Sequence, residues 1–274
     1  METNDKTSRQ WSPEEIPLDK PSASRIYDYL LGGYHNFASD RQVTDQLLQL
    51  NPDMGLAAQV NRGFLRRAVT YLLSQGIDQF LDIGSGIPTV GNVHQVAQTS
   101  NPEARVVYVD VDPVAVAHSQ AILVDNPRAT AIRADVRQPE TILAHDEVQR
   151  LLDFERPIGL LMVALLHYVV GDEIAYPVVS TLRAAMTPGS YLVVAHSLLE
   201  LQGGDKGEQV AETFRAASNS QYRTEAQIRR FFGDWDLVEP GLVYTPLWRP
   251  EGPDDVFLDD PGRGLTMAGV ARKP

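Results

Sequence analysis

The stretch that decides the fold is "QFLDIGSGIPTVGNV", residues 79–93. An apolar run, Phe80 to Ile83, ends at the turn Gly84-Ser85-Gly86, and a segment that could begin a helix follows. A strand that leads through a glycine-rich turn into a helix is typical of a ligand-binding turn in a parallel sheet. The rest of the sequence has to show whether that ligand is a phosphate or something uncharged or cationic.

After this turn, apolar runs alternate with segments of helical composition. The apolar runs lie at residues 79–83, 106–111, 129–133, 158–165 and 190–196. Strands separated by helices predict an α/β fold with a mostly parallel sheet and right-handed crossovers. Residues 235–248 and 264–274 form two further extended runs, which are joined by a loop rich in proline and acidic residues. This pair fits an antiparallel hairpin at the edge of the sheet.

The first quarter of the chain is predicted to be helical. Apolar residues recur at helical spacing on both sides of the Gly32-Gly33 pair and again between residues 60 and 73, with Gly76 as a helix stop. Residues 1–21 carry proline and charge without periodicity. We therefore expect a flexible N-terminal arm (1–21), a helical cap (22–76) and a ligand-binding α/β domain (77–274).

Composition restricts the possible partners and compartments. The 274 residues are 43% hydrophobic, which allows a sizeable core, and 36 acidic against 24 basic residues argue against a nucleic-acid surface. The chain has no cysteine, which is compatible with a reducing cytosol. The N-terminus shows no signal-peptide pattern, and the longest apolar run, 158–166, is shorter than the roughly 20 residues of a membrane span. We expect a soluble, cytoplasmic protein that binds no membrane; its oligomeric state stays open.

Carboxylates stand at the ends of three successive predicted strands: Asp82, then Asp110 and Asp112, then Asp135. Each could simply cap the helix that follows, and Asp112, which precedes Pro113, has the features of such a cap. Because the carboxyl ends of parallel strands share one edge of the sheet, their joint placement favours a ligand site over capping alone.

The same residues indicate which ligand binds there. A dinucleotide site requires a third glycine, but its position holds Thr89, after Pro88. Asp82 beside the turn would repel a pyrophosphate and attract a cation. Asp110, about 24 residues past Gly86, suits a carboxylate that accepts both ribose hydroxyls. A nucleoside with a positively charged tail is implied, and S-adenosylmethionine fits that description.

Successive motifs support this prediction through resemblance to a known family. The stretches at residues 80–89, 106–113, 133–139, 160–169 and 188–197 are "FLDIGSGIPT", "VVYVDVDP", "RADVRQP", "LLMVALLHYV" and "PGSYLVVAHS". They resemble the motifs of Rossmann-like S-adenosylmethionine-dependent methyltransferases. The segments at 24–41, 61–69, 239–243 and 269–274 are "SRIYDYLLGGYHNFASDR", "NRGFLRRAV", "EPGLV" and "GVARKP". They are similar to the S-adenosyl methyltransferase family, formerly a domain of unknown function.

The resemblance implies a Rossmann-like, seven-stranded sheet and a role for each matching residue. The backbone of Gly84, Ser85 and Gly86 would approach the methionine part of the cofactor, with Asp82 near its amino end. Asp110 would bind the ribose hydroxyls, and Val111 and Val136 would contact the two faces of adenine. Asp135 would accept from the exocyclic amine of adenine, and Asp112 is a weaker candidate for a contact. Pro88 departs from the broad pattern, which carries a small residue there.

Methyl transfer chiefly requires alignment of donor and acceptor, so a general base is optional. If the acceptor must lose a proton, His167, after the apolar run 160–166, is the predicted base, and His196 is a second candidate. Either histidine could instead be a buried residue bonded to a carbonyl group. The other histidines lack ligand spacing, and we expect no metal.

The segment around Gly32-Gly33 admits a structural and a functional interpretation. Its aromatic residues, among them Tyr27, could pack into the core. Alternatively, the glycine bend could fold back as a lid, with Tyr34 and Asn36 reaching the cofactor and Arg62 pairing with the methionine carboxylate.

Three functions are compatible with the sequence. The first is a methyltransferase that acts on a small molecule or a protein side chain. The second is a non-catalytic sensor of S-adenosylmethionine, and the third is a nicotinamide-dependent oxidoreductase, which the missing third glycine disfavours. Labelling of acceptors in a cell extract would separate the first two, and thermal protection by NAD would identify the third.

Overall fold

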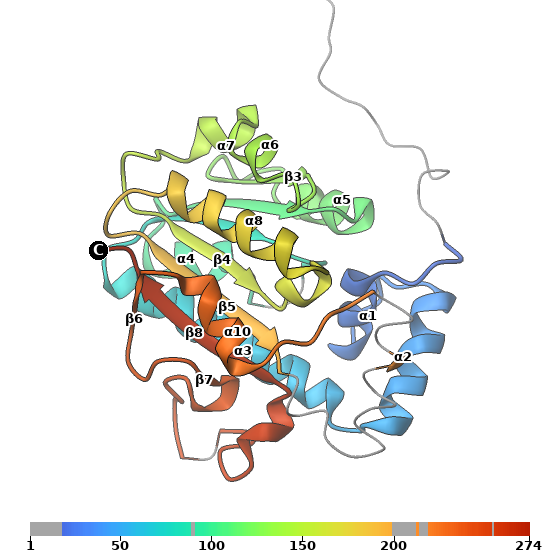
Figure 1. Ribbon diagram of the computed structural model, residues 1–274. Helices are drawn as coiled ribbons and strands as arrows, with labels where there is room; N and C mark the ends of the chain where they lie inside the picture. The colour runs from blue at the N-terminus through green and yellow to red at the C-terminus, as the bar shows by residue number, and fades with distance from the viewer. Residues whose placement is uncertain (1–17, 89–90, 199–211, 214–218, 254) are drawn as a thin grey trace, which may run out of the picture.

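The computed structural model describes residues 18–88, 91–198, 212–213, 219–253 and 255–274. Residues 1–17 of the predicted arm and Thr89, at the position of the third glycine, therefore lie outside the described residues. Helices and a central sheet form layers in this part of the chain (Figure 1). The division into arm, cap and α/β domain stays a prediction.

The sheet confirms the predicted α/β architecture. Its strands are β1 (Gln79–Ile83), β2 (Arg105–Asp110), β3 (Ala129–Arg133), β4 (Gly159–Val163), β5 (Tyr191–Ser197), β6 (Asp236–Leu237), β7 (Val243–Tyr244) and β8 (Thr266–Arg272). They follow the order β3-β2-β1-β4-β5-β8-β6, and β7 also pairs with β8. Strands β1 to β5 are parallel, and β8 runs antiparallel to β5, β6 and β7.

The predicted hairpin is present, but its first half is split. Two short strands, β6 and β7, pair with different parts of β8, so the sheet has eight strands where seven were expected. A segment with Pro240 and Gly241 separates the two pieces. Proline donates no backbone hydrogen bond, so pairing is interrupted there.

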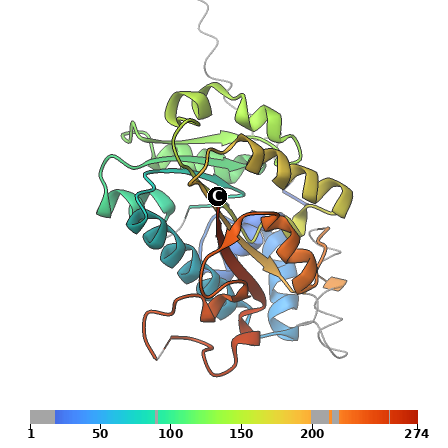
Figure 2. The ribbon, with the colours of Figure 1, turned by 60° about the vertical axis from the view of Figure 1, so that its left-hand side comes forward.

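Helices cover both faces of the sheet. On one face lie α6 (Pro139–Leu143), α7 (Asp146–Leu151), α8 (Asp172–Ala185) and α10 (Glu225–Arg229). On the other lie α3 (Met54–Ser74), α4 (Val93–Ser100) and Leu123, which directly follows α5 (Pro113–Ile122). Figure 2 shows the sheet between α8 and α4. All five β1 residues are buried, as expected for a parallel strand covered on both sides.

The N-terminal helices begin and end close to the predicted positions. Helices α1 (Ala23–Leu30) and α2 (Ala38–Leu50) flank the glycine pair, and Gly76 follows α3 with a left-handed backbone. Side chains of α3, among them Phe64 and Leu72, share one buried cluster with Phe80 of β1. Short 3-10 segments complete the fold: η2 (Leu166–Tyr168), η4 (Arg230–Phe232), η5 (Thr245–Leu247) and η6 (Pro261–Gly264). None of the described helices combines the length and apolar character needed to cross a bilayer.

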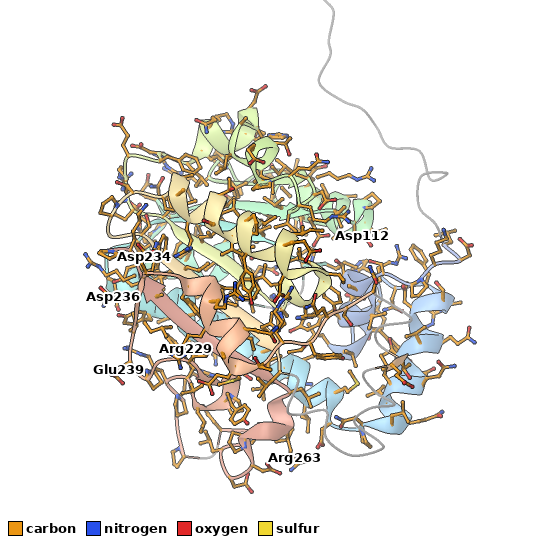
Figure 3. All side chains as sticks on the ribbon, viewed as in Figure 1. Asp112, Arg229, Asp234, Asp236, Glu239 and Arg263 are labelled. Carbon is orange, nitrogen blue, oxygen red and sulfur yellow. The ribbon has the colours of Figure 1, made fainter. Side chains whose placement is uncertain are left out.

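A buried arginine ties α1 and α2 to the sheet. Arg25, 2% exposed, places Nε 2.9 Å from Asp40 Oδ2 and Nη1 3.3 Å from Asp112 Oδ2. Ser22 donates its hydroxyl to Asp112 and its backbone N–H to Asp40. Figure 3 labels Asp112 where the N-terminal helices meet the sheet. The contact fixes α1 against the turn between β2 and α5.

Candidate cofactor-binding site

A cavity of about 330 Å³ opens at the carboxyl ends of β1 to β4. This is the edge at which open parallel sheets bind ligands. The volume of the cavity lies near the lower end of the range for small-molecule pockets, about 300–1,000 Å³. Most of the predicted cofactor residues line it: Arg62, Asp82, Gly84, Ser85, Gly86, Asp110, Val111, Asp135 and Val136. The structure thus brings together residues that the sequence separates by more than seventy positions.

The glycine turn forms one wall of the cavity because of its backbone geometry. Gly84 and Gly86 have φ values of 73° and 68°, in the left-handed region that favours glycine. The N–H groups of Gly84 and Ser85 donate to the carbonyl of Val109 at 2.7 and 3.2 Å. A Cβ atom on Gly84 would lie 2.6 Å from Leu165 Cδ1, so this position has no space for a side chain.

Two buried carboxylates lie beside the turn. Burial raises the pKa of Asp82 to about 7, an effect that Arg62 opposes and Asp110 reinforces. Burial also raises the pKa of Asp110 to about 6, although this carboxylate accepts backbone N–H groups of Asp112 and Gly86, both at 2.8 Å. A bound cation would stabilise the ionised form of these carboxylates, so the cavity suits a ligand with a sulfonium or ammonium group.

We expect the affinity for S-adenosylmethionine to depend on pH. Because both pKa values are raised, the folded chain favours the protonated carboxyls, and their contribution to stability is lost as the pH rises from about 4 to about 7. A cationic ligand prefers the ionised carboxylates, so its affinity should increase about tenfold from pH 5 to pH 8 and level off above 7. Calorimetric titration measures this, and Asp82→Asn should remove most of the slope.

The matched control for this pH profile is Asp125→Asn, at an exposed position after α5. It should leave the profile unchanged. An affinity for S-adenosylmethionine that is flat from pH 5 to pH 8 in the unmodified chain would contradict the assignment of Asp82 to the cationic end of the ligand.

The far end of the cavity carries the residues predicted to contact adenine. Val111 is 58% exposed and Val136 is 9% exposed, and both line the cavity. Asp135 forms an ion pair with Arg137, whose Nε lies 2.9 Å from both carboxylate oxygens. This pair lowers the pKa of Asp135, so the carboxylate is ionised at neutral pH. An amine from a ligand would share the carboxylate with Arg137.

Three predicted residues lie away from the cavity. Asp112 caps α5 by accepting the N–H of Val114 at 2.8 Å and uses its other oxygen in the contacts with Ser22 and Arg25. Tyr34 is 92% exposed. Asn36 is buried, but its Nδ2 donates to Asp28 and to the carbonyl of Gly33, both at 2.9 Å. Their predicted contacts with the cofactor stay untested.

The path of the chain after α1 explains this placement. Gly32 has a φ of 79°, and a Cβ on Gly33 would lie within 2.1 Å of Asp28 Oδ1, so the chain turns tightly around Asp28. The bend directs the following residues away from the cavity. Ser24 and Tyr27, on one face of α1, line the cavity instead. Their spacing of three residues, which places both on one face of a helix, is the sequence signal for this contact.

The two candidate histidines lie in different surroundings. His196 is fully buried; its Nδ1 donates to the carbonyl of Ser197 at 2.8 Å, and its Nε2 accepts from Arg223 at 3.0 Å. Burial lowers the pKa of His196 to about 3. His167 lines a smaller chamber beside the cofactor cavity, and its Nδ1 is buried without a partner. Of these two histidines, His167 is therefore the one with a ring nitrogen available at a cavity.

Comparisons with known proteins agree with this geometry. The S-adenosyl methyltransferase family matches residues 9–274. A crystallised Thermobifida fusca protein, described as a candidate methyltransferase, is 44% identical, with 96% of this chain and 99% of that chain covered and a TM-score of 0.89. A DUF574 family protein from Streptomyces avermitilis is 35% identical, with 94% and 99% covered and a TM-score of 0.87.

A more distant likeness shows the fold alone. The mitomycin 7-O-methyltransferase MmcR is 14% identical, with 91% of this chain and 68% of that chain covered and a TM-score of 0.52. No curated protein matches the chain. The match over nearly the whole length and the two similar crystal structures decide the assignment: the chain belongs to the S-adenosyl methyltransferase family and is an S-adenosylmethionine-dependent methyltransferase.

Proposed function

We propose that this enzyme binds S-adenosylmethionine in the cavity at the ends of β1 to β4 and methylates a small-molecule acceptor. The observation that carries the proposal is the pair of buried carboxylates, Asp82 and Asp110, beside a glycine turn in which Gly84 has no room for a side chain. When bound, the cofactor supplies a methyl carbon on a sulfonium, which is transferred as the bonding pair returns to sulfur. Because the cofactor carries positive charge on its sulfonium and its amino group, a cavity with two carboxylates attracts it.

Each lining residue has a role in this proposal. Asp110 accepts the ribose hydroxyls, and Val111 and Val136 hold the adenine between them. The turn from Gly84 to Gly86 passes beside the methionine part. Arg62 lines the cavity, and its Nη2 lies 3.4 Å from Asn92 Oδ1. Its guanidinium pairs with the carboxylate of the methionine part.

His167 is the proposed proton acceptor. Burial, together with His196 and Arg223, holds its pKa well below the usual range, so the imidazole is neutral at physiological pH. An acceptor hydroxyl or amine becomes a much stronger acid as its lone pair bonds to the methyl carbon, and His167 then takes the proton. The requirement on the protein is alignment rather than a strong base.

Substitution of Asp110 tests the cofactor site. Asp110→Asn removes a charged acceptor, and hydrogen bonds to charged groups contribute about 1.5–3 kcal/mol. We expect the Kd for S-adenosylhomocysteine, measured by calorimetry, to rise about 10- to 100-fold. The exposed Asp125→Asn is the control and should leave it unchanged. Equal affinity in both variants would place the ligand elsewhere.

Labelling tests the acceptor class. The enzyme is incubated with methyl-labelled cofactor and with either the low-molecular-weight or the protein fraction of a cell extract. We expect label in the small-molecule fraction. Label in proteins alone would contradict the proposed acceptor class, and binding without any labelling would favour a sensor.

A further inference from the structure

A second chamber of about 80 Å³ lies next to the cofactor cavity. The two spaces share four lining residues: Tyr27, Asn61, Ala164 and Tyr168. Ala164, just after β4, has a φ of 56°, a left-handed backbone that is rare for a residue other than glycine. Strained backbone is thus placed where the two spaces meet, as is common at functional sites.

The chamber is lined by uncharged side chains. Tyrosine rings, aliphatic side chains from α3 and the backbone of η6 contribute to it, and none of its lining residues within the described ranges is an Asp, Glu, Lys or Arg. Placing an ion there would remove its hydration without supplying an opposite charge, which is costly. The flat rings of Tyr27, Tyr168 and Tyr222 favour a planar occupant over a bulky one.

Two polar atoms of the chamber's lining residues are buried without hydrogen-bond partners. One is Asn61 Oδ1, on a residue that is 4% exposed, and the other is His167 Nδ1, on a residue that is 5% exposed. The amide of Asn61 is oriented by its Nδ2, which donates to Tyr27 Oη at 2.9 Å, so Oδ1 is left as an acceptor. Buried polar atoms of this kind are rare, and each costs free energy until a ligand satisfies it.

The segment that carries His167 is held rigidly. Arg223, fully buried, donates to the carbonyl groups of Leu166 and Val169 at 2.9 and 3.0 Å. The N–H of Gln221 donates to the carbonyl of His167 at 2.7 Å. With its flanking carbonyls fixed, the imidazole presents its free nitrogen in a defined place, which a binding site requires.

We propose that this chamber binds the reacting end of the methyl acceptor and that this end is an uncharged, planar group with a hydroxyl or amine, such as a phenol or an arylamine. An amine has two N–H groups and donates to both Asn61 Oδ1 and His167 Nδ1. A hydroxyl has one proton, so it either donates to Asn61 Oδ1 and accepts from His167 Nδ1–H, or donates to His167 Nδ1 in the tautomer that can take up the proton. The inference rests on the proposed function, which places the methyl donor in the adjoining cavity.

The test compares small probes of similar shape and different charge. Phenol, aniline, benzoate, benzylammonium and cyclohexanol are each titrated into enzyme saturated with S-adenosylhomocysteine, and binding is followed by ligand-observed NMR. We expect phenol and aniline to bind at least about tenfold more tightly than the two ions and cyclohexanol. Preference for benzoate or benzylammonium would overturn the proposed chemistry.

Variants locate the binding. His167→Phe and Asn61→Leu should each weaken phenol binding about tenfold, the value of one lost hydrogen bond. His167→Gln, which keeps a hydrogen-bonding group, should retain most of it. Because Asn61 also lines the cofactor cavity, the control for folding is the circular dichroism spectrum and the thermal unfolding midpoint of each variant. Unchanged phenol binding in both His167→Phe and Asn61→Leu would overturn the inference.

The two proposals fail in distinguishable ways. If S-adenosylhomocysteine binds and neither phenol nor aniline does, the acceptor chamber is wrong and the cofactor site stands. If phenol binds at His167 but Asp110→Asn leaves the affinity for S-adenosylhomocysteine unchanged, the chamber stands and the placement of the cofactor is wrong.

Discussion

Gly84→Val should weaken binding of S-adenosylhomocysteine by roughly 100-fold. A left-handed backbone costs a residue with a Cβ about 1–2 kcal/mol, and forcing a side chain into a packed contact costs about 1–3 kcal/mol more. The new side chain would overlap Leu165, whose Cβ lies 3.0 Å from the position of the added atom. Because Leu165 and the turn both line the cavity, either of them must move into the ligand's space. Calorimetric titration measures the effect.

Gly76→Val is the matched control for Gly84→Val. Gly76 has a φ of 85°, but an added Cβ there would meet no atom within 4 Å, and the residue lies outside the cavity. This variant should lose stability for the same backbone reason while its affinity for S-adenosylhomocysteine stays within about threefold. Equal loss of affinity in the two variants would mean that general destabilisation, and not the shape of the cavity, controls binding.

Arg25→Met should lower the free energy of unfolding by about 3–5 kcal/mol, because removing one partner of a buried ion pair leaves the other charges uncompensated. Here two carboxylates, Asp40 and Asp112, would lose the same guanidinium. The carbonyl of Lys20, which accepts from Arg25 Nη2 at 2.6 Å, would also lose its donor. Urea unfolding followed by circular dichroism measures the change.

The control for Arg25→Met is Arg263→Met. Arg263 makes a similar pair of contacts, both at 2.8 Å, with Asp53, but it is exposed, as its labelled position in Figure 3 shows. Water screens an exposed ion pair, so this variant should leave the free energy of unfolding nearly unchanged. If the two variants lost the same stability, burial would not be what gives the Arg25 contact its strength.

Local patterns in the sequence predicted the parts of the molecule that depend on local interactions. The five parallel strands were found because each is a short apolar run bounded by turns, and β1 and β3 match their predicted bounds. The acidic strand ends were found because the carboxyl ends of parallel strands meet at one edge. Asp82 and Asp110 therefore reach one cavity, as expected.

Features that depend on packing between distant segments were not predicted. Nor does any periodicity encode the local contact of Gly33 with Asp28, which turns the chain so that Tyr34 and Asn36 do not line the cavity; their contacts with the cofactor stay a prediction. Asp112 was recognised as a cap, whereas its contact with Arg25, 87 positions away, was not. The second chamber combines residues of α1, α3, the segment after β4 and η6, so it exists only in the folded chain.

The position of β8 has a consequence for how the chain is made. This strand of seven residues lies between β5 and the short strands β6 and β7, and it pairs with all three. During synthesis the five parallel strands leave the ribosome before β8. Until β8 pairs with β5, the backbone N–H and C=O groups along that edge of the apolar strand β5 are unpaired and can bind other chains. Nascent molecules are therefore most prone to aggregate just before Thr266 emerges, and expression at low temperature or with a holding chaperone should raise the yield.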